Sequence, residues 1–338
     1  MIFAKLLNAY SHPTFFANNA KRSLLCSDSS KKVRRKIEVL DNRLNLPLAK
    51  KSLSIFEGEH PSSQKFGNGD LVDVHAWQPG DEARMINWKA SARVGEPMVS
   101  SRQRESSSKT WILVDSSLNM NASCASKSNE YLYETASNTA CFFASLSLKR
   151  NDSLDCTLFD GDSILRIPSC RNLPDFERSL DISLCNARKN PRSTNAIIDF
   201  ANSITQKHSL IVIITDEYAI LQKHFNDLQK IASLHSLIVV TINPVNPFSA
   251  SKNIPIVDGT TMRKIPAFLI DDSCAKEVKA HRTFVNDALH ECLNTSKACL
   301  IRGSSSNQIF HSLAKFICNA TLQNSVFNVK KNQDLLLD

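Results

Sequence analysis

Two acidic residues, Asp115 and Asp216, each follow a short apolar run that is typical of a buried strand, in the segments WILVD and LIVIITD. Ligands of open α/β sheets bind at the carboxyl ends of the strands, so these positions are candidates for chemistry. Ser117 and Asn119 follow Asp115 at alternate positions, and oxygen atoms at this spacing suit a small hard cation such as Mg²⁺. An acidic residue in this place also caps helices or turns, and Ser and Asn form turns, so the spacing alone leaves both interpretations open.

The elements that must position these residues alternate between strands and helices from Thr110 onward. Apolar runs predict strands at 111–115, 156–159, 163–167, 210–215, 237–242 and 298–301, of which the second and third form a hairpin. Apolar periodicity predicts helices near 130–148, 174–184, 195–206, 220–233, 275–295 and 307–320. Strands that alternate with helices indicate an α/β fold with a mostly parallel sheet covered on both faces.

Residues 57–109 differ in composition, because they hold five of the eight glycines of the chain, at 58, 67, 69, 80 and 95. This concentration predicts turns and short strands, including a strand at 72–78 and a helix over 82–91 with Asp81 as its cap. The expected divisions are a helical, basic N-terminal extension (1–56), a β-rich module (57–109), an α/β domain (110–322) and a C-terminal tail (323–338).

The net charge of +8 is concentrated near the N-terminus. Between Lys21 and Lys51, ten Lys or Arg residues outnumber three acidic ones. Such a stretch either binds nucleic acid or an anionic membrane surface, or forms the solvated face of an amphipathic helix. No aromatic residues interleave with these charges to stack on bases, so we favour the helix and expect no nucleic-acid partner.

The composition is that of a globular protein, since 42% of the 338 residues are hydrophobic and 22% are charged. No run approaches the about 18 unbroken apolar residues that span a bilayer, so we expect no transmembrane segment. The first residues lack the order of a secretory signal, and the ten cysteines form no C-x-x-C pair. We therefore expect reduced thiols and a cytoplasmic protein.

Enzyme motifs are missing from the sequence. It contains no nucleophile elbow, Walker loop or dinucleotide fingerprint, and no His pair with the spacing of zinc enzymes. Asp115 could serve as an aspartyl nucleophile, but Ser117 stands where such a site has a second acidic residue. We therefore expect a non-enzymatic protein.

The stretch WQPGDEARMINWKASARVGEPMV at 77–99 resembles the signature of the bacterial "domain of unknown function 58" family. The matching residues are Pro79, Gly80, Asp81, Arg84, Asn87, Trp88, Ser91, Ala92 and Arg93. The lead-in at 58–70 and the segment INPVNPF at 242–248 also resemble this family. The D-x-S-x-N motif is similar to the D-x-S-x-S motif of von Willebrand factor A domains. The resemblance implies a von Willebrand factor A-like, doubly wound, mostly parallel sheet, preceded by a small β-rich module.

In that signature Arg84, Trp88 and Arg93 either tie the module to the α/β domain, with Asp81 as an acidic partner, or contact another protein.

The same resemblance implies a metal-ion-dependent adhesion site that binds Mg²⁺, with Mn²⁺ or Ca²⁺ as alternatives. Its ligands would be Asp115, Ser117, Asn119, Thr194 and Asp216. Asn119 stands where the family usually has Ser. The pair Arg192-Ser193 stands where the family commonly has two glycines, which adds a positive charge near the site. These departures leave loss of the ion as an alternative.

For function, the resemblance implies a Mg²⁺-dependent adaptor that works with a MoxR-type AAA+ ATPase in a chaperone-like or assembly role. A partner's Asp or Glu would then complete the coordination of the ion. A metal-independent scaffold with a degenerate site is the second hypothesis. A binder of nucleic acid or membrane surfaces through residues 21–51 is the third.

Overall fold

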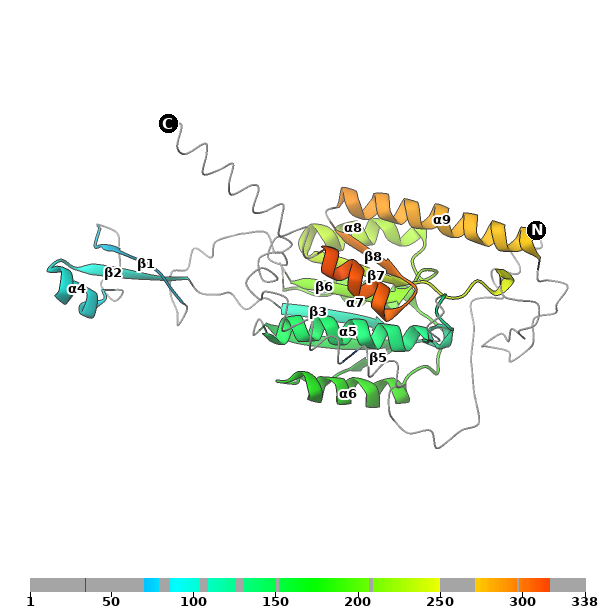
Figure 1. Ribbon diagram of the computed structural model, residues 1–338, viewed down its shortest axis with the longest axis horizontal. Helices are drawn as coiled ribbons and strands as arrows, with labels where there is room; N and C mark the ends of the chain where they lie inside the picture. The colour runs from blue at the N-terminus through cyan, green and yellow to red at the C-terminus, as the bar shows by residue number, and fades with distance from the viewer. Residues whose placement is uncertain are drawn as a thin grey trace. The chain divides into compact units, whose positions relative to one another are not determined.

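The computed structural model describes residue 34 and residues 70–78, 86–103, 109–125, 130–149, 152–206, 209–249, 271–296 and 298–316. The chain divides into two compact units. Residues 58–107 form the smaller unit, and residues 1–57 together with 108–338 form the larger one. Figure 1 shows both units and labels most of their helices and strands.

The larger unit is built on a six-stranded sheet with the strand order β5-β4-β3-β6-β7-β8. Its strands are β3 (Lys109–Asp115), β4 (Ser153–Asp160), β5 (Ser163–Arg166), β6 (Leu210–Asp216), β7 (Ser236–Ile242) and β8 (Cys299–Gly303). The strands pair in parallel except for β5, which lies at one edge as the antiparallel hairpin partner of β4. In chain order this is the 3-2-1-4-5-6 arrangement of doubly wound α/β sheets. It confirms the predicted α/β fold with a doubly wound, mostly parallel sheet.

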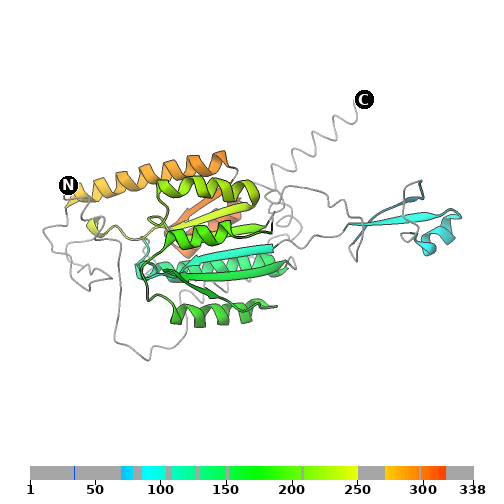
Figure 2. The ribbon, with the colours of Figure 1, turned by 180° about the vertical axis from the view of Figure 1, so that it is seen from behind.

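Helices cover both faces of this sheet, as Figures 1 and 2 show. Ile112 and Val114 belong to one core cluster and Leu113 to the other, because successive side chains of a strand point to opposite faces. The first face is covered by α5 (Leu132–Lys149), α6 (Leu173–Asn186) and a helix at 306–316, and the second by α7 (Thr194–Asn202), α8 (Phe225–Leu234) and α9 (Asp272–Thr295). Burial on both faces explains why the central strands are unbroken apolar runs.

The predicted strands and helices of this unit occur, and two helix ends differ from the prediction by four residues or more. A separate 3₁₀ turn, η3 (Gln222–His224), precedes α8, which therefore begins at Phe225. α7 ends at Asn202 because the Ser203 hydroxyl donates to the Phe200 carbonyl at 2.7 Å and closes the last turn.

In its described residues, the smaller unit has two antiparallel strands and one short helix. These are β1 (Asp70–Ala76), α4 (Trp88–Val94) and β2 (Met98–Gln103). The strand predicted at 72–78 corresponds to β1, which begins and ends two residues earlier.

The helix predicted over 82–91 with Asp81 as its cap is wrong in its start. Ile86 forms a bridge with Val99, so the backbone is still extended there. Asn87 caps α4, since its side-chain oxygen accepts the Ala90 N–H at 3.1 Å. Asp81 itself lies outside the described residues.

In the part of the chain that the structure describes, no helix is both long and apolar enough to cross a bilayer. The described cysteines are free thiols. Burial raises the pKa of Cys124 and of Cys299 to about 12, so both stay neutral at physiological pH.

Candidate functional site at the carboxyl ends of the parallel strands

Asp115 and Asp216 lie at the same edge of the sheet. They end β3 and β6, which are adjacent and parallel, with Val114 paired to Ile214. Both residues are almost fully buried, with exposed fractions of 1% and 3%. The structure therefore brings together the two acidic residues that the strand ends indicated, although they are 101 positions apart in the sequence.

The Asp115 carboxylate accepts two hydrogen bonds from its own sheet and turn. One oxygen accepts the Ser117 N–H at 3.0 Å, and the other accepts the Thr215 hydroxyl at 2.8 Å. Burial raises the pKa of Asp115; the Arg192 charge opposes this rise, and the Asp216 charge adds to it. The carboxylate is thus held by hydrogen bonds in a place where ionisation is costly.

Arg192 supplies the positive charge of the site. Its terminal nitrogen donates to the Asp216 carboxylate at 2.6 Å, and its Nε lies 3.9 Å from the Asp115 carboxylate. The side chain is only 12% exposed. Burial disfavours the charge of the guanidinium, but Asp216 and Asp115 outweigh it and raise the pKa of Arg192. The guanidinium therefore stays charged and joins the two acidic residues.

Thr194 and Asn119 do not take part in these contacts. The Thr194 hydroxyl donates to the Ala219 carbonyl at 3.0 Å, so it fastens the start of α7 to the chain after β6. The side-chain oxygen of Asn119 is buried in η2 (Leu118–Asn121) and accepts no hydrogen bond. Of the five predicted ligands, the carboxylates of Asp115 and Asp216 meet at Arg192, and Ser117 joins them through its backbone N–H.

A network around Asp160 fixes the loop that carries Arg192. The Asp160 carboxylate accepts the N–H groups of Lys189 and Asn190 at 2.8–3.1 Å. Gly161 has φ +64°, and a Cβ there would lie 2.7 Å from the Pro191 carbonyl oxygen. The turn between β4 and β5 therefore packs directly against the backbone of the loop that carries Arg192, and this close approach requires a glycine at position 161.

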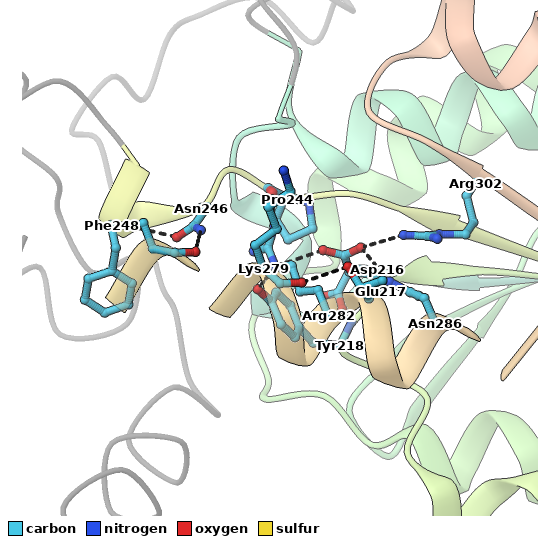
Figure 3. A network of polar contacts seen from close by, with 12 residues as sticks. Asp216, Glu217, Tyr218, Pro244, Asn246, Phe248, Lys279, Arg282, Asn286 and Arg302 are labelled. Atoms are coloured by element: carbon cyan, nitrogen blue, oxygen red, sulfur yellow. Dashed lines mark hydrogen bonds and ion pairs between the residues drawn. The ribbon is translucent and has the colours of Figure 1, made fainter. Parts of the chain in front are cut away.

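A second ion cluster lies beside the first and was not predicted (Figure 3). Glu217 is buried next to Asp216, and its carboxylate lies 3.0 Å from Arg282, 3.5 Å from Arg302 and 3.3 Å from the Asn286 amide. Burial raises the pKa of Glu217, and Arg282 opposes the rise most strongly. This cluster ties the chain after β6 to α9 and β8.

Tyr218 and Pro244 complete this cluster. Arg282 lies over the Tyr218 ring, 4.6 Å from its centroid, and donates to the Pro244 carbonyl at 3.1 Å. Burial raises the pKa of Tyr218 to about 12. The adjacent acidic residues Asp216 and Glu217 are a sequence signal that could have pointed here, but their partners are too distant in sequence to form a pattern.

The signature residues of the smaller unit fall into two groups. The described residues are Asn87, Trp88, Ser91, Ala92 and Arg93, and Pro79, Gly80, Asp81 and Arg84 lie outside the described residues. Asn87 is the helix cap, Arg93 is exposed in the last turn of α4, and the Trp88 side chain is 74% exposed. Trp88 therefore packs little against its own unit.

A family model described as "Protein of unknown function DUF58" matches residues 73–255, more than half of the chain. The chain belongs to the DUF58 family. The matched part of this DUF58 chain includes Arg192 and all five predicted metal ligands. Uncharacterized proteins of Mycobacterium tuberculosis and Mycobacterium bovis are 20% identical to it over 260 residues, which span 74% of this chain and 80% of theirs.

Solved structures similar to this DUF58 chain include the conserved hypothetical protein BatB from Bacteroides thetaiotaomicron, which is 16% identical with a TM-score of 0.39 over 63% of this chain and 98% of that one. An aerotolerance-related membrane protein from Bacteroides fragilis is 17% identical with a TM-score of 0.37, over 63% and 99%. The SpRpn10 VWA domain is 11% identical with a TM-score of 0.34, over 62% and 94%.

The divalent ion that resemblance to DUF58 proteins implies does not fit the residues as they are arranged. Within the described residues, no group of three or more His, Cys, Asp or Glu side chains could hold a metal ion. The Arg192 guanidinium lies between the two carboxylates and would repel a divalent cation placed beside it. The magnesium site therefore stays a prediction that these contacts disfavour.

Proposed function

We propose that this DUF58 chain is a non-enzymatic protein-interaction module that binds a partner at the carboxyl edge of its large sheet. The observation that carries this proposal is a set of exposed aromatic and apolar side chains in the loops at that edge. We call this set the edge surface; its members are Tyr131, Tyr218, Leu221 and Val245. Aromatic residues with Arg beside them are enriched in protein interfaces.

Hydrogen bonds between the loops support this role, because they order the edge surface before a partner arrives. The Leu118 N–H donates to the Asn190 carbonyl at 2.9 Å, and the Val245 N–H donates to the Ser123 carbonyl at 2.9 Å. A preorganised surface loses less conformational entropy when it binds. The edge surface is therefore suited to a stable, specific contact.

As the partner we propose a MoxR-type AAA+ ATPase, in a chaperone-like or assembly role. Membership of the DUF58 family and the signature around Trp88 support this partner. The sequence has no Walker loop, so ATP hydrolysis in such a pair would belong to the ATPase. We propose a cytoplasmic location for the pair, which the buried free thiols support.

We propose that this contact does not require a metal ion, because Arg192 already neutralises part of the charge of the two buried carboxylates. Mg²⁺-dependent docking is the second candidate. The buried, unpartnered oxygen of Asn119 favours it, since an amide oxygen is a ligand for a hard cation.

Binding of a purified MoxR-type ATPase to the immobilised full-length chain tests the proposal. Leu221 at the edge surface and Leu234 at the end of α8 are 50% and 49% exposed, and they lie at opposite edges of the sheet. We expect Leu221→Glu to weaken binding at least about tenfold, as loss of an interface anchor does. The matched variant Leu234→Glu should bind like the wild type.

Equal effects of the two variants would contradict the edge surface as the docking site. The same titration in EDTA and in MgCl₂ separates the two candidates. Equal affinity in both buffers supports metal-independent docking, and loss of binding in EDTA supports the Mg²⁺-dependent form.

A further inference from the structure

Arg192 occupies the place that resemblance assigns to a divalent cation. The guanidinium contacts Asp216 at 2.6 Å and approaches Asp115 to 3.9 Å, and these are the two carboxylates of the predicted metal site. A guanidinium and a divalent cation that share the same carboxylates exclude each other by repulsion. The contacts of Arg192 therefore bear on metal binding whatever the partner of the chain is.

The buried carboxylates have hydrogen-bond partners without an ion. Asp115 accepts from the Ser117 N–H and the Thr215 hydroxyl. Asp216 accepts from Arg192 and from the Tyr218 N–H at 2.7 Å. Buried charges persist in a protein when they are both paired and hydrogen-bonded, and the Arg192 cluster meets both conditions.

Arg192 is held in this place by the path of its loop. The Asp160 carboxylate binds the backbone of Lys189 and Asn190, and the Asn190 carbonyl accepts the Leu118 N–H from the other side. The loop is therefore already ordered in the folded chain, and the entropic cost of ordering it belongs to folding rather than to the contact of Arg192 with the carboxylates. A preorganised cation competes with a dissolved one at an advantage, because it loses no translational freedom on binding.

We propose that Arg192 is a built-in replacement for the divalent cation, and that the site takes up Mg²⁺ or Mn²⁺ only when this guanidinium is removed. The two carboxylates, the Ser117 hydroxyl and the Asn119 amide oxygen are then the donors left to an ion. This inference does not rest on the identity or existence of a docking partner.

Mn²⁺ binding to the purified full-length chain tests the proposal, with free Mn²⁺ measured by electron paramagnetic resonance. We expect Arg192→Ala to bind Mn²⁺ at least about tenfold more tightly than the wild type. The double variant Arg192→Ala/Asp115→Asn should lose this gain. Arg188→Ala is the matched control, because Arg188 belongs to the same loop but lies over the Tyr133 ring, 4.0 Å from its centroid. It should bind Mn²⁺ as weakly as the wild type.

Thermal unfolding gives a second readout. In EDTA the Arg192→Ala variant should melt below the wild type, and MnCl₂ should raise its Tm while leaving that of the wild type unchanged. If Arg192→Ala does not fold, Arg192→Gln removes the charge with less loss of volume and is measured in the same way. A wild type that binds Mn²⁺ as tightly as either variant, or a folded variant that binds none, would overturn the proposal.

Discussion

The two acidic residues of the site have unequal partners. Asp216 has a direct ion pair with Arg192, whereas Asp115 relies on a backbone N–H and a hydroxyl, with the guanidinium 3.9 Å away. Burial raises the pKa of Asp115 above its ordinary value, so the folded chain binds this proton more readily than the unfolded chain. Ionised Asp115 therefore costs stability at neutral pH, and the cost falls as the pH drops through the raised pKa.

This asymmetry predicts that Asp115→Asn is tolerated. Asn keeps an acceptor for the Ser117 N–H and removes a buried charge. The free energy of unfolding of the variant at pH 7.5 should therefore be no lower than that of the wild type, and higher by about 1 kcal/mol at most. The advantage should shrink as the pH falls, because the wild type gains stability when Asp115 is protonated as the pH drops through its raised pKa. Urea unfolding at a series of pH values measures it. A variant clearly less stable than the wild type at pH 7.5 would refute this account of Asp115.

Asp216 should behave in the opposite way, because its removal leaves a buried guanidinium without its direct partner. We expect Asp216→Ala to lower the free energy of unfolding by about 3 kcal/mol. Asp227→Ala is the control, since Asp227 forms an exposed pair with Lys230 at 2.9 Å and such pairs contribute about 1 kcal/mol or less. Urea unfolding at pH 7.5 measures both variants. Similar losses would show that the buried pair of Arg192 and Asp216 stabilises the fold no more than an exposed pair does.

At the scale of elements, the hairpin end of β4 and β5 sets the path of the Arg192 loop. Replacing Gly161 by Ala would place a Cβ 2.7 Å from the Pro191 carbonyl oxygen and 2.9 Å from the Asn190 Cβ, at a φ of +64°. The positive φ strains the backbone of an alanine, and its Cβ collides with the loop. We therefore expect a loss of about 2 kcal/mol or more in the free energy of unfolding.

The consequence of Gly161→Ala should also reach the site, because the displaced loop carries Arg192. We expect the variant to bind Mn²⁺ more tightly than the wild type, measured as for Arg192→Ala. Gly95→Ala in the smaller unit is a useful contrast, since a Cβ there meets nothing within 4 Å despite a φ of +84°. A Gly161→Ala chain as stable as the wild type would contradict this prediction, because it would mean that the loop moves aside for the added Cβ without a loss of stability.

The sheet was predictable because burial on both faces leaves a local record, a continuous apolar run for each central strand. The meeting of Asp115 and Asp216 followed from the rule that parallel strands end at one edge. The start of α4 was not predictable, because Ile86 is kept extended by its bridge to Val99, which has no local sequence pattern. The contact of Arg192 with Asp115 and Asp216 was not predictable either, since it depends on the path of a loop that Asp160 fixes.

At the scale of the whole molecule, Arg34 shows that at least one residue of the basic N-terminal stretch packs on the α/β domain. Its guanidinium donates to both oxygens of Asp181 in α6, at 2.6 and 2.8 Å, and to the Ser137 hydroxyl of α5 at 2.8 Å. Arg34 is buried, so its charge is directed into the domain rather than toward solvent. This contact favours a structural role for Arg34 over binding of nucleic acid or membranes.

Arg34→Ala should therefore act on stability. A bidentate pair that is largely buried leaves an unpaired carboxylate when its Arg is removed, so we expect a loss of about 3 kcal/mol in the free energy of unfolding. Lys230→Ala, which breaks an exposed pair, should cost about 0.5 kcal/mol. The competing hypothesis predicts that Arg34→Ala leaves urea unfolding unchanged but weakens the binding of a DNA duplex at low salt. That result would favour residues 21–51 as a binding site for an anionic partner. A guanidinium that pairs with Asp181 is not free to bind phosphate, so the two roles of Arg34 exclude each other.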